Sequence, residues 1–249
     1  MSTTLINPAV LRSEFRLYGR EPGSLFWVLL FPSLLLGILG SVPSFREAQD
    51  GLGGLRTVDV YVPVSVLIAL ITAGVQAMPP TLTGYRENGI LRRLSTTPVR
   101  PASLLAAQML VNGLVALASA LLTLTVGRLA FDVRLPEQPL GYLLALLLAV
   151  CAALSLGAVV SARARTTKIA TAIGTAVFFP MLFSAGVWVP VQAMPEVLAR
   201  IVQCTPFGAA ARALDQAAAG DWPGWGHLAV LAAWTVVLSV SAARWFRWE

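Results

Sequence analysis

Residues 139–161 read PLGYLLALLLAVCAALSLGAVVS, and no charged side chain interrupts them. The hydrocarbon core of a bilayer is about 30 Å thick and a helix rises about 1.5 Å per residue, so about 20 apolar residues cross it. Uncharged helices of this length are longer than those of typical globular proteins. The stretch therefore predicts a helix that spans a membrane.

Five more apolar blocks of similar length occur along the chain. Together they give six predicted spans, at residues 24–42, 58–79, 103–127, 139–161, 169–189 and 226–245. Only 12% of the 249 residues are charged, whereas about 25% are charged in an average soluble domain. So little charge would not solvate the surface of a globular protein of this size. We predict an all-α membrane protein in which residues 1–249 form one transmembrane domain with six helices.

The distribution of charge predicts how the chain is oriented. The N-terminal segment, the loops after spans two and four, and the C-terminus hold twelve basic and four acidic residues, a net charge of +8. The other face holds six basic and eight acidic residues, a net charge of −2. Because positive charge gathers on the cytoplasmic side, we expect both termini in the cytoplasm. This asymmetry explains the basic chain without a nucleic-acid partner. Arginine outnumbers lysine 17 to 1, which favours a GC-rich bacterial genome, and we expect the protein in a bacterial plasma membrane.

Residues 7–20, NPAVLRSEFRLYGR, predict a short amphipathic helix before span one. Asn7 suits the N-cap and Pro8 suits the first helical position. The apolar stripe of this helix consists of Leu11, Phe15 and Tyr18. The basic stripe beside it consists of Arg12, Arg16 and Arg20. Such a helix lies in the headgroup plane with its arginines toward the cytoplasm. Alternatively, the segment is a basic tail that only sets the topology.

The loop at residues 80–102, PTLTGYRENGILRRLSTTPVRPA, connects spans two and three. Residues 85–94 predict about two and a half turns of cytoplasmic amphipathic helix. The apolar residues Ile90, Leu91 and Leu94 are grouped on one face. The charged residues lie on other faces and are Arg86, Glu87, Arg92 and Arg93. The prolines at 98 and 101 end this helix. Exposed leucines favour a protein partner, and the alternative is a solvated connecting loop.

The segment after span five, residues 184–224, is long and apolar for an external loop. Pro190, Pro195 and Pro206 divide it into pieces that are too short to cross a bilayer. We therefore expect one or two short re-entrant or interfacial helices that cap the external end. The alternative is a partly ordered external loop.

The sequence lacks the residues that most catalytic and ion-coupled sites need. His227 is the single histidine and Lys168 the single lysine, so neither a multi-histidine metal site nor a phosphate-binding GxxxxGK[ST] loop is present. No Asp, Glu, Lys or His lies deep in a predicted span, which argues against a proton-coupled transporter or an intramembrane enzyme. We expect no enzyme activity, cofactor or metal. Gln76 and Asn112 are either interhelical hydrogen-bonding residues or substrate contacts.

Residues 87–108, ENGILRRLSTTPVRPASLLAAQ, resemble the membrane subunits of type-2 ATP-binding-cassette exporters. In that family a Glu and a Gly precede a Leu/Arg-rich turn, then Thr-Pro and a basic residue; here these are Glu87, Gly89, Leu91 to Leu94, Thr97-Pro98 and Arg100. A second match follows span five and consists of Ser184, Gly186, Pro190, Pro195, Thr205-Pro206 and Arg212. The sequence departs from this second pattern at Ala185, which is inserted between the Ser and the Gly.

The resemblance implies a half-transporter that pairs in the bilayer with a second copy of itself or with a related permease. It implies two separate ATPase subunits at the cytoplasmic face, which carry the ATP and Mg. The residues that the resemblance assigns to ATPase coupling are Glu87, Gly89, Leu91, Arg92, Arg93 and Leu94, beside an interfacial helix with Leu11, Arg12, Phe15 and Arg16. Short members of this kind look most like drug and antibiotic efflux permeases of the daunorubicin-resistance type.

The same resemblance implies a central path for a small-molecule substrate among spans one, two and five. The residues expected to line an apolar route are Gln76, Phe178, Phe179, Met181 and Phe183. The alternative for the span-five residues is ordinary helix packing or lipid contact. For the whole chain, the alternatives are export of a lipid-linked glycan or a lipid, and a membrane scaffold that uses no nucleotide.

Overall fold

The computed structural model describes residues 8–49, 52, 54–90, 93 and 101–245. Within these residues the chain is almost entirely helical, and no strand is formed beyond a single bridge between Ala48 and Arg56. All six predicted spans are confirmed as helices that are long and apolar enough to cross a membrane. They are Pro22–Ser41, Thr57–Glu87, Ser103–Phe131, Pro139–Arg163, Thr167–Ser184 and Trp225–Trp245.

Spans one and two each contain a π-helical segment in place of regular α-helix. Span one consists of α2 (Pro22–Ser24), η1 (Leu25–Leu30) and α3 (Phe31–Ser41), and span two of α4 (Thr57–Ile71), η4 (Thr72–Ala77) and α5 (Met78–Glu87). In both spans a proline follows the π-helical segment, at Pro32 and at Pro79. Because proline lacks an N–H and its ring crowds the preceding turn, it favours a widened turn there. Such segments are frequent at functional sites.

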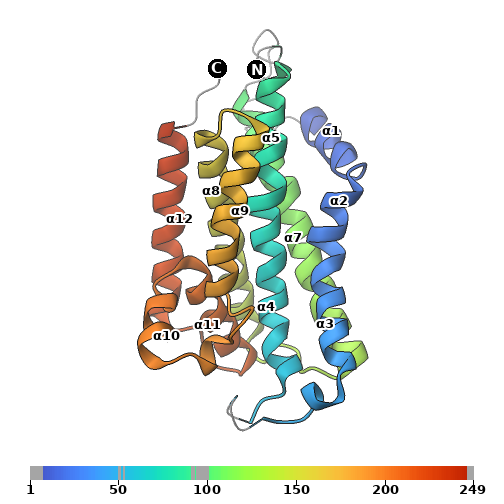
Figure 1. The fold of residues 1–249 in the computed structure, drawn as a ribbon, viewed down its shortest axis with the longest axis vertical. Coiled ribbons are helices and arrows are strands. Elements are labelled where there is room, and N and C mark those ends of the chain that lie inside the picture. The colour runs from blue at the N-terminus through green and yellow to red at the C-terminus, as the bar shows by residue number, and fades with distance from the viewer. Residues whose placement is uncertain (1–7, 50–51, 53, 91–92, 94–100, 246–249) are drawn as a thin grey trace.

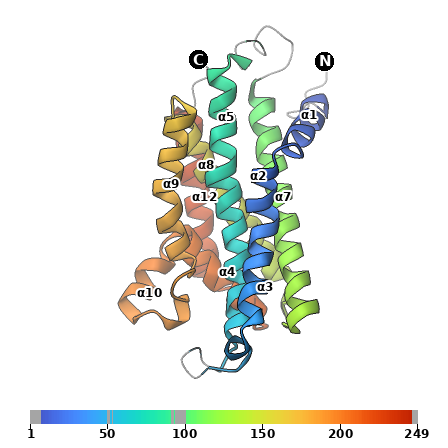
Figure 2. The same ribbon diagram turned by 45° about the vertical axis from the view of Figure 1, so that its right-hand side comes forward.

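Span two forms the centre of the bundle. Its most apolar 18 residues are 89% buried, whereas the corresponding shares of the other spans are between 22% and 61%. Figures 1 and 2 show α4 and α5 between two groups of helices, with α3 and α7 (Pro101–Phe131) on one side. On the other side lie α8 (Pro139–Arg163), α9 (Thr167–Ser184) and α12 (Trp225–Trp245). A movement of span two therefore changes contacts on both sides of the bundle.

Glycines bring spans four and five into backbone contact with the π-helical segment of span two. A Cβ placed on Gly157 of α8 would lie 1.8 Å from the carbonyl oxygen of Gly74. One placed on Gly174 of α9 would lie 2.8 Å from the carbonyl oxygen of Val75. Small residues allow this close approach, which is the usual way for helices to pack inside a membrane.

The two ends of the bundle are built differently. The α1 end carries the amphipathic helix α1 (Pro8–Tyr18) together with the ends of α5, α8 and α12 and the beginnings of α7 and α9. The α11 end carries η2 (Pro43–Arg46), η5 (Val191–Ala193), α10 (Glu196–Gln203) and α11 (Pro206–Ala218). The expected short helices between spans five and six are thus present as α10 and α11. Thr205 caps α11 by accepting a hydrogen bond from the Gly208 N–H at 3.2 Å.

The two largest differences between predicted and observed span boundaries both arise at glycines. Span two continues to Glu87 instead of ending near residue 79, and its helix stops where Gly89 adopts a φ of +67°. Span five ends at Ser184 instead of residue 189, because the chain turns at Gly186 with a φ of +87°. Only glycine adopts such angles without strain, so each position ends its helix.

Candidate coupling site

Helix α1 presents one face to the bundle and the others outward. Glu14 and Tyr18 are buried, Leu11 is half-buried and Phe15 is exposed. Of the predicted apolar stripe of Leu11, Phe15 and Tyr18, Tyr18 is therefore the member that packs against protein. The arginines of the predicted basic stripe, Arg12, Arg16 and Arg20, are exposed.

A buried polar cluster joins α1 to spans two and three. The Glu14 carboxylate accepts hydrogen bonds from the Tyr85 hydroxyl at 2.9 Å and from the Gln108 amide nitrogen. Asn112 extends the cluster, because its amide nitrogen donates to the Gln108 side-chain oxygen at 3.1 Å. Burial raises the pKa of Glu14, and the hydrogen bonds from Tyr85 and Gln108 oppose that rise. The cluster fixes α1 to α5 and α7 at the α1 end.

Arg86, the next residue of span two, connects span two to span four. The Arg86 guanidinium donates hydrogen bonds to the carbonyl oxygen of Ala164 at 2.8 Å and to that of Ser161 at 3.3 Å. These carbonyls belong to the C-terminal end of α8, where a cation interacts favourably with the helix dipole. Arg86 therefore holds the end of α5 against the end of α8.

Glu87, the last residue of span two, connects span two to span five. The Thr167 hydroxyl donates a hydrogen bond to the exposed Glu87 carboxylate. Thr167 begins α9, whose N-cap Thr166 accepts a hydrogen bond from the Ile169 N–H at 3.2 Å. A carboxylate at this helix N-terminus is favourably placed in the field of the helix dipole.

Three consecutive residues of span two thus hold three different sides of the bundle. Successive helical residues point about 100° apart, because a turn contains about 3.6 residues. Tyr85 therefore reaches α1 and span three, and Arg86 reaches span four. Glu87 reaches span five. A force applied to the chain just after Glu87 would act on all of these elements at once.

A groove of about 590 Å³ opens between spans one, two and five. Its lining is mostly apolar, with Gln76 and Thr72 among its polar side chains. Both π-helical segments line it, and the residues from span one include Trp27, Phe31 and Leu35. Of the predicted substrate-path residues, Gln76 and Phe178 line this groove.

The remaining three path residues lie elsewhere. Met181 is half-buried and packs against the core, whereas Phe179 and Phe183 are 54% and 38% exposed on the outside of span five. The ring of Phe179 stacks on Trp188, with the ring centroids 6.3 Å apart. The structure therefore brings two of the five predicted residues together.

The comparison with known protein families identifies the chain. The family described as ABC-2 type transporter matches residues 8–217, from the start of α1 to the last turn of α11. The chain belongs to the ABC-2 type transporter family. It is a multi-pass membrane protein and a membrane component of an ATP-binding-cassette transporter. No curated protein matches the sequence.

The predicted coupling segment of this ABC-2 transporter subunit differs from a single helix over residues 85–94. Tyr85 to Glu87 belong to span two, and the N–H groups of Asn88 and Gly89 close its last turn on Gly84 and Arg86. A new helical hydrogen bond then runs from the Arg93 N–H to the Gly89 carbonyl oxygen at 3.0 Å. The other predicted coupling residues, Leu91, Arg92 and Leu94, lie outside the described residues.

Sequence reasoning missed five residues of the site, namely Glu14, Tyr85, Arg86, Gln108 and Thr167. A signal was present for Glu14, because positions 11, 14 and 18 lie on one stripe of a helix. An acidic residue on the same stripe as Leu11 and Tyr18 indicates a buried polar contact. Gln108 carried no comparable signal, since its partner is 94 positions away.

Proposed function

We propose that this chain is the permease half of an ATP-driven exporter that moves hydrophobic or amphiphilic drugs, with energy from separate ATPase subunits. The observation that carries the proposal is the set of contacts from Tyr85, Arg86 and Glu87 to α1 and to spans three, four and five. A bundle held in this way converts a local push at one point into a rearrangement of the whole α1 end.

The ATPase subunits dock at the α1 end, which faces the cytoplasm of a bacterial cell. The support is the excess of positive charge on the segments that gather at this end, which is typical of cytoplasmic loops. The docking segment is the chain that follows Glu87, including Gly89, Leu91, Arg92, Arg93 and Leu94. Its leucines suit an apolar cleft, and its arginines suit acidic groups of the partner.

Closure of the ATPase subunits on ATP moves this segment and, through Glu87, the beginning of α9. It also moves α1 through the hydrogen bond between Tyr85 and Glu14. Helix α1 leads directly into span one, so spans one and five shift relative to span two. These are the three spans that line the groove with Gln76 and Phe178.

The size and the lining of the groove suit a hydrophobic or amphiphilic substrate. Its volume of about 590 Å³ lies in the range of small-molecule sites. Its apolar walls suit an aromatic drug, and Gln76 offers one amide for orientation. A second copy of the chain, or a related permease, covers the open side of this groove and gives it the form of a central path. Phe179 and Phe183 face the lipid or that second permease.

The test is export by the assembled complex. The chain is purified with the ATPase that accompanies it and placed in liposomes, and ATP-dependent movement of daunorubicin and of a fluorescent phospholipid is measured. The proposal expects ATP-dependent movement of daunorubicin and no ATP hydrolysis by the permease alone. Movement of the phospholipid alone would favour the lipid-exporter alternative. ATP hydrolysis by the isolated chain, or purification without any ATPase, would contradict the proposal.

A further inference from the structure

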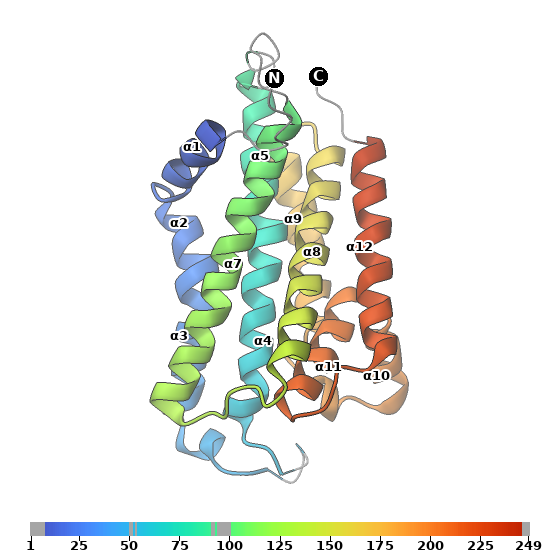
Figure 3. The ribbon, with the colours of Figure 1, turned by 180° about the vertical axis from the view of Figure 1, so that it is seen from behind.

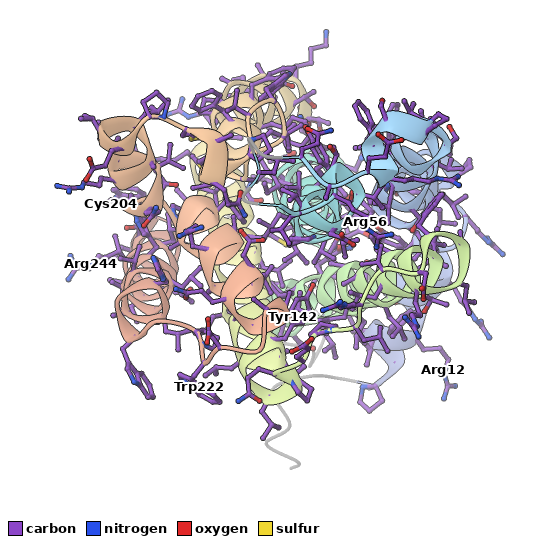
Figure 4. All side chains as sticks on the ribbon, turned by 90° about the horizontal axis from the view of Figure 1, so that it is seen from below. Arg12, Arg56, Tyr142, Cys204, Trp222 and Arg244 are labelled. Atoms are coloured by element: carbon purple, nitrogen blue, oxygen red, sulfur yellow. The ribbon has the colours of Figure 1, made fainter. Side chains whose placement is uncertain are left out.

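A second cavity, of about 680 Å³, lies at the α11 end, and it shares no lining residue with the groove. The loop before α4, the loop between α7 and α8, and helix α11 all contribute to it. Figure 4 views the molecule from this end, with Arg56 beside α4 and Tyr142 beside α8 and α11. Apolar side chains such as Val60, Val62 and Leu124 line the cavity together with charged ones.

Four carboxylates line the cavity, and three of them have an arginine partner. The pairs are Asp59 with Arg56 at 2.7 Å, Asp132 with Arg128 at 2.8 Å, and Glu137 with Arg134 at 3.9 Å. The fourth carboxylate, Asp215 of α11, forms no ion pair within 4.0 Å in the part of the chain that the structure describes. It accepts a hydrogen bond from the neutral Gln192 amide. Asp215 is therefore the carboxylate of this cavity that lacks a cationic partner.

A second group of the cavity also lacks a partner. Tyr142 is only 5% exposed, and its hydroxyl makes no hydrogen bond to any described residue. Buried hydroxyl groups are normally hydrogen-bonded, because leaving one without a partner is energetically costly. Tyr142 and Asp215 line the same cavity and interact electrostatically. Two polar groups without a charged partner among the described residues therefore border the same cavity.

The environment of Asp215 disfavours its bare charge. Burial raises the pKa of Asp215 to about 7, although Arg212 and the hydrogen bond from Gln192 act in the opposite direction. Arg212 lies one turn away on α11 and does not line the cavity. A cation inside the cavity would offset the cost of the ionised carboxylate.

We propose that this cavity binds an organic cation, namely a protonated amine with an apolar body. The Asp215 carboxylate neutralises the ammonium group, and the Tyr142 hydroxyl oxygen accepts a hydrogen bond from one of its N–H groups. The apolar body packs against Val60, Val62 and Leu124. An anion is disfavoured, because four acidic and two basic residues line the cavity. Its use as an exit station for cationic drugs rests on the proposed export function, whereas the binding itself does not.

The test measures binding to the purified chain in nanodiscs of phosphatidylcholine, without any ATPase. The probe is monodansylcadaverine, a primary alkylamine with an aromatic dansyl group whose fluorescence rises in apolar surroundings, and its N-acetylated form is the neutral control. Empty nanodiscs correct for partition into lipid. The variants are Asp215→Asn, Tyr142→Phe and Asp221→Asn, the last being an exposed acid at the same end that does not line the cavity.

The amine should bind saturably to the wild-type chain and to Asp221→Asn with the same Kd. Because a hydrogen bond to a charged group contributes about 1.5–3 kcal/mol, Asp215→Asn should raise that Kd about tenfold or more. Tyr142→Phe should raise it several-fold. Equal binding of the amine and its acetylated form, unchanged binding by Asp215→Asn, or an absence of saturable binding would overturn the proposal. Since the assay contains no ATPase, its failure and a failure of drug export are separate results.

Discussion

The Tyr85 hydroxyl donates a hydrogen bond to the buried Glu14 carboxylate at 2.9 Å, and this contact joins the end of span two to the helix that leads into span one. The two residues are 71 positions apart in the sequence. Glu14 is 4% exposed, so neither water nor lipid readily replaces Tyr85 as its hydrogen-bond donor. The contact is therefore the direct route by which a movement of the segment after span two reaches span one.

Tyr85→Phe removes this hydrogen bond and keeps the ring. Since a hydrogen bond to a charged group contributes about 1.5–3 kcal/mol, we expect drug export per ATP hydrolysed to fall about tenfold or more. Assembly with the ATPase should be retained. The matched control is Tyr18→Phe, because the buried Tyr18 hydroxyl has no hydrogen-bond partner among the described residues. Equal coupling in the two variants would show that the contact with Glu14 transmits nothing.

Glu87→Ala releases the beginning of α9 from the end of span two, because Thr167 loses its acceptor. Because Glu87 is exposed, its replacement leaves the fold intact. We therefore expect normal amounts of the assembled complex and several-fold less export per ATP hydrolysed. Thr167→Val should have the same effect from the other side of the contact. Glu21→Ala, which removes an exposed acid at the same end of the bundle, is the control. Full coupling in both contact variants would contradict the role of Glu87.

Gly157→Ala should destabilise the bundle itself. The added Cβ would lie 1.8 Å from the Gly74 carbonyl oxygen, so spans two and four would have to separate. Overpacking of this kind costs about 1–3 kcal/mol or more. We expect a lower thermal midpoint in detergent, measured by the loss of monodisperse protein on heating. Gly37→Ala is the control, because no atom lies within 4 Å of the corresponding Cβ on span one. Equal midpoints would refute the close contact.

Asp215→Asn should stabilise the protein at alkaline pH. The pKa of Asp215 is about 7 in the folded chain against an ordinary value of 3.8, so the folded state holds this proton more tightly. Stability from this group is full below about pH 4 and is lost as the pH rises through about 7. Thermal midpoints should therefore be higher for Asp215→Asn than for wild type at pH 8, with a smaller difference at pH 6. A lower midpoint at pH 8 would show that the charge is stabilised by Arg212 or another neighbour.

The spans were predictable because length and apolar composition alone decide whether a helix can cross a bilayer. Boundaries set by backbone conformation were less predictable, since Gly89 and Gly186 end their helices through positive φ angles that hydropathy does not reveal. Gly89 is the reason that Tyr85 lies in span two and not in a separate coupling helix.

The functional contacts were less predictable than the spans. Glu14 meets Gln108 and Tyr142 shares a cavity with Asp215 only after helices that are far apart in sequence have packed. Phe178 and Phe179 show the same limit within one helix. Adjacent residues of a helix point about 100° apart, so Phe178 faces the groove and Phe179 faces outward.

Cross-linking tests most directly whether the ATPase acts on the chain beyond span two. A photoreactive amino acid is introduced at Ile90, an exposed residue just after Gly89, and in a second variant at Trp222, an exposed residue at the α11 end. The assembled complex is irradiated in the membrane, and cross-linked ATPase is detected by its mass. The account predicts a cross-link to the ATPase from Ile90 and none from Trp222. A cross-link from Trp222 with none from Ile90 would contradict both the orientation and the coupling site.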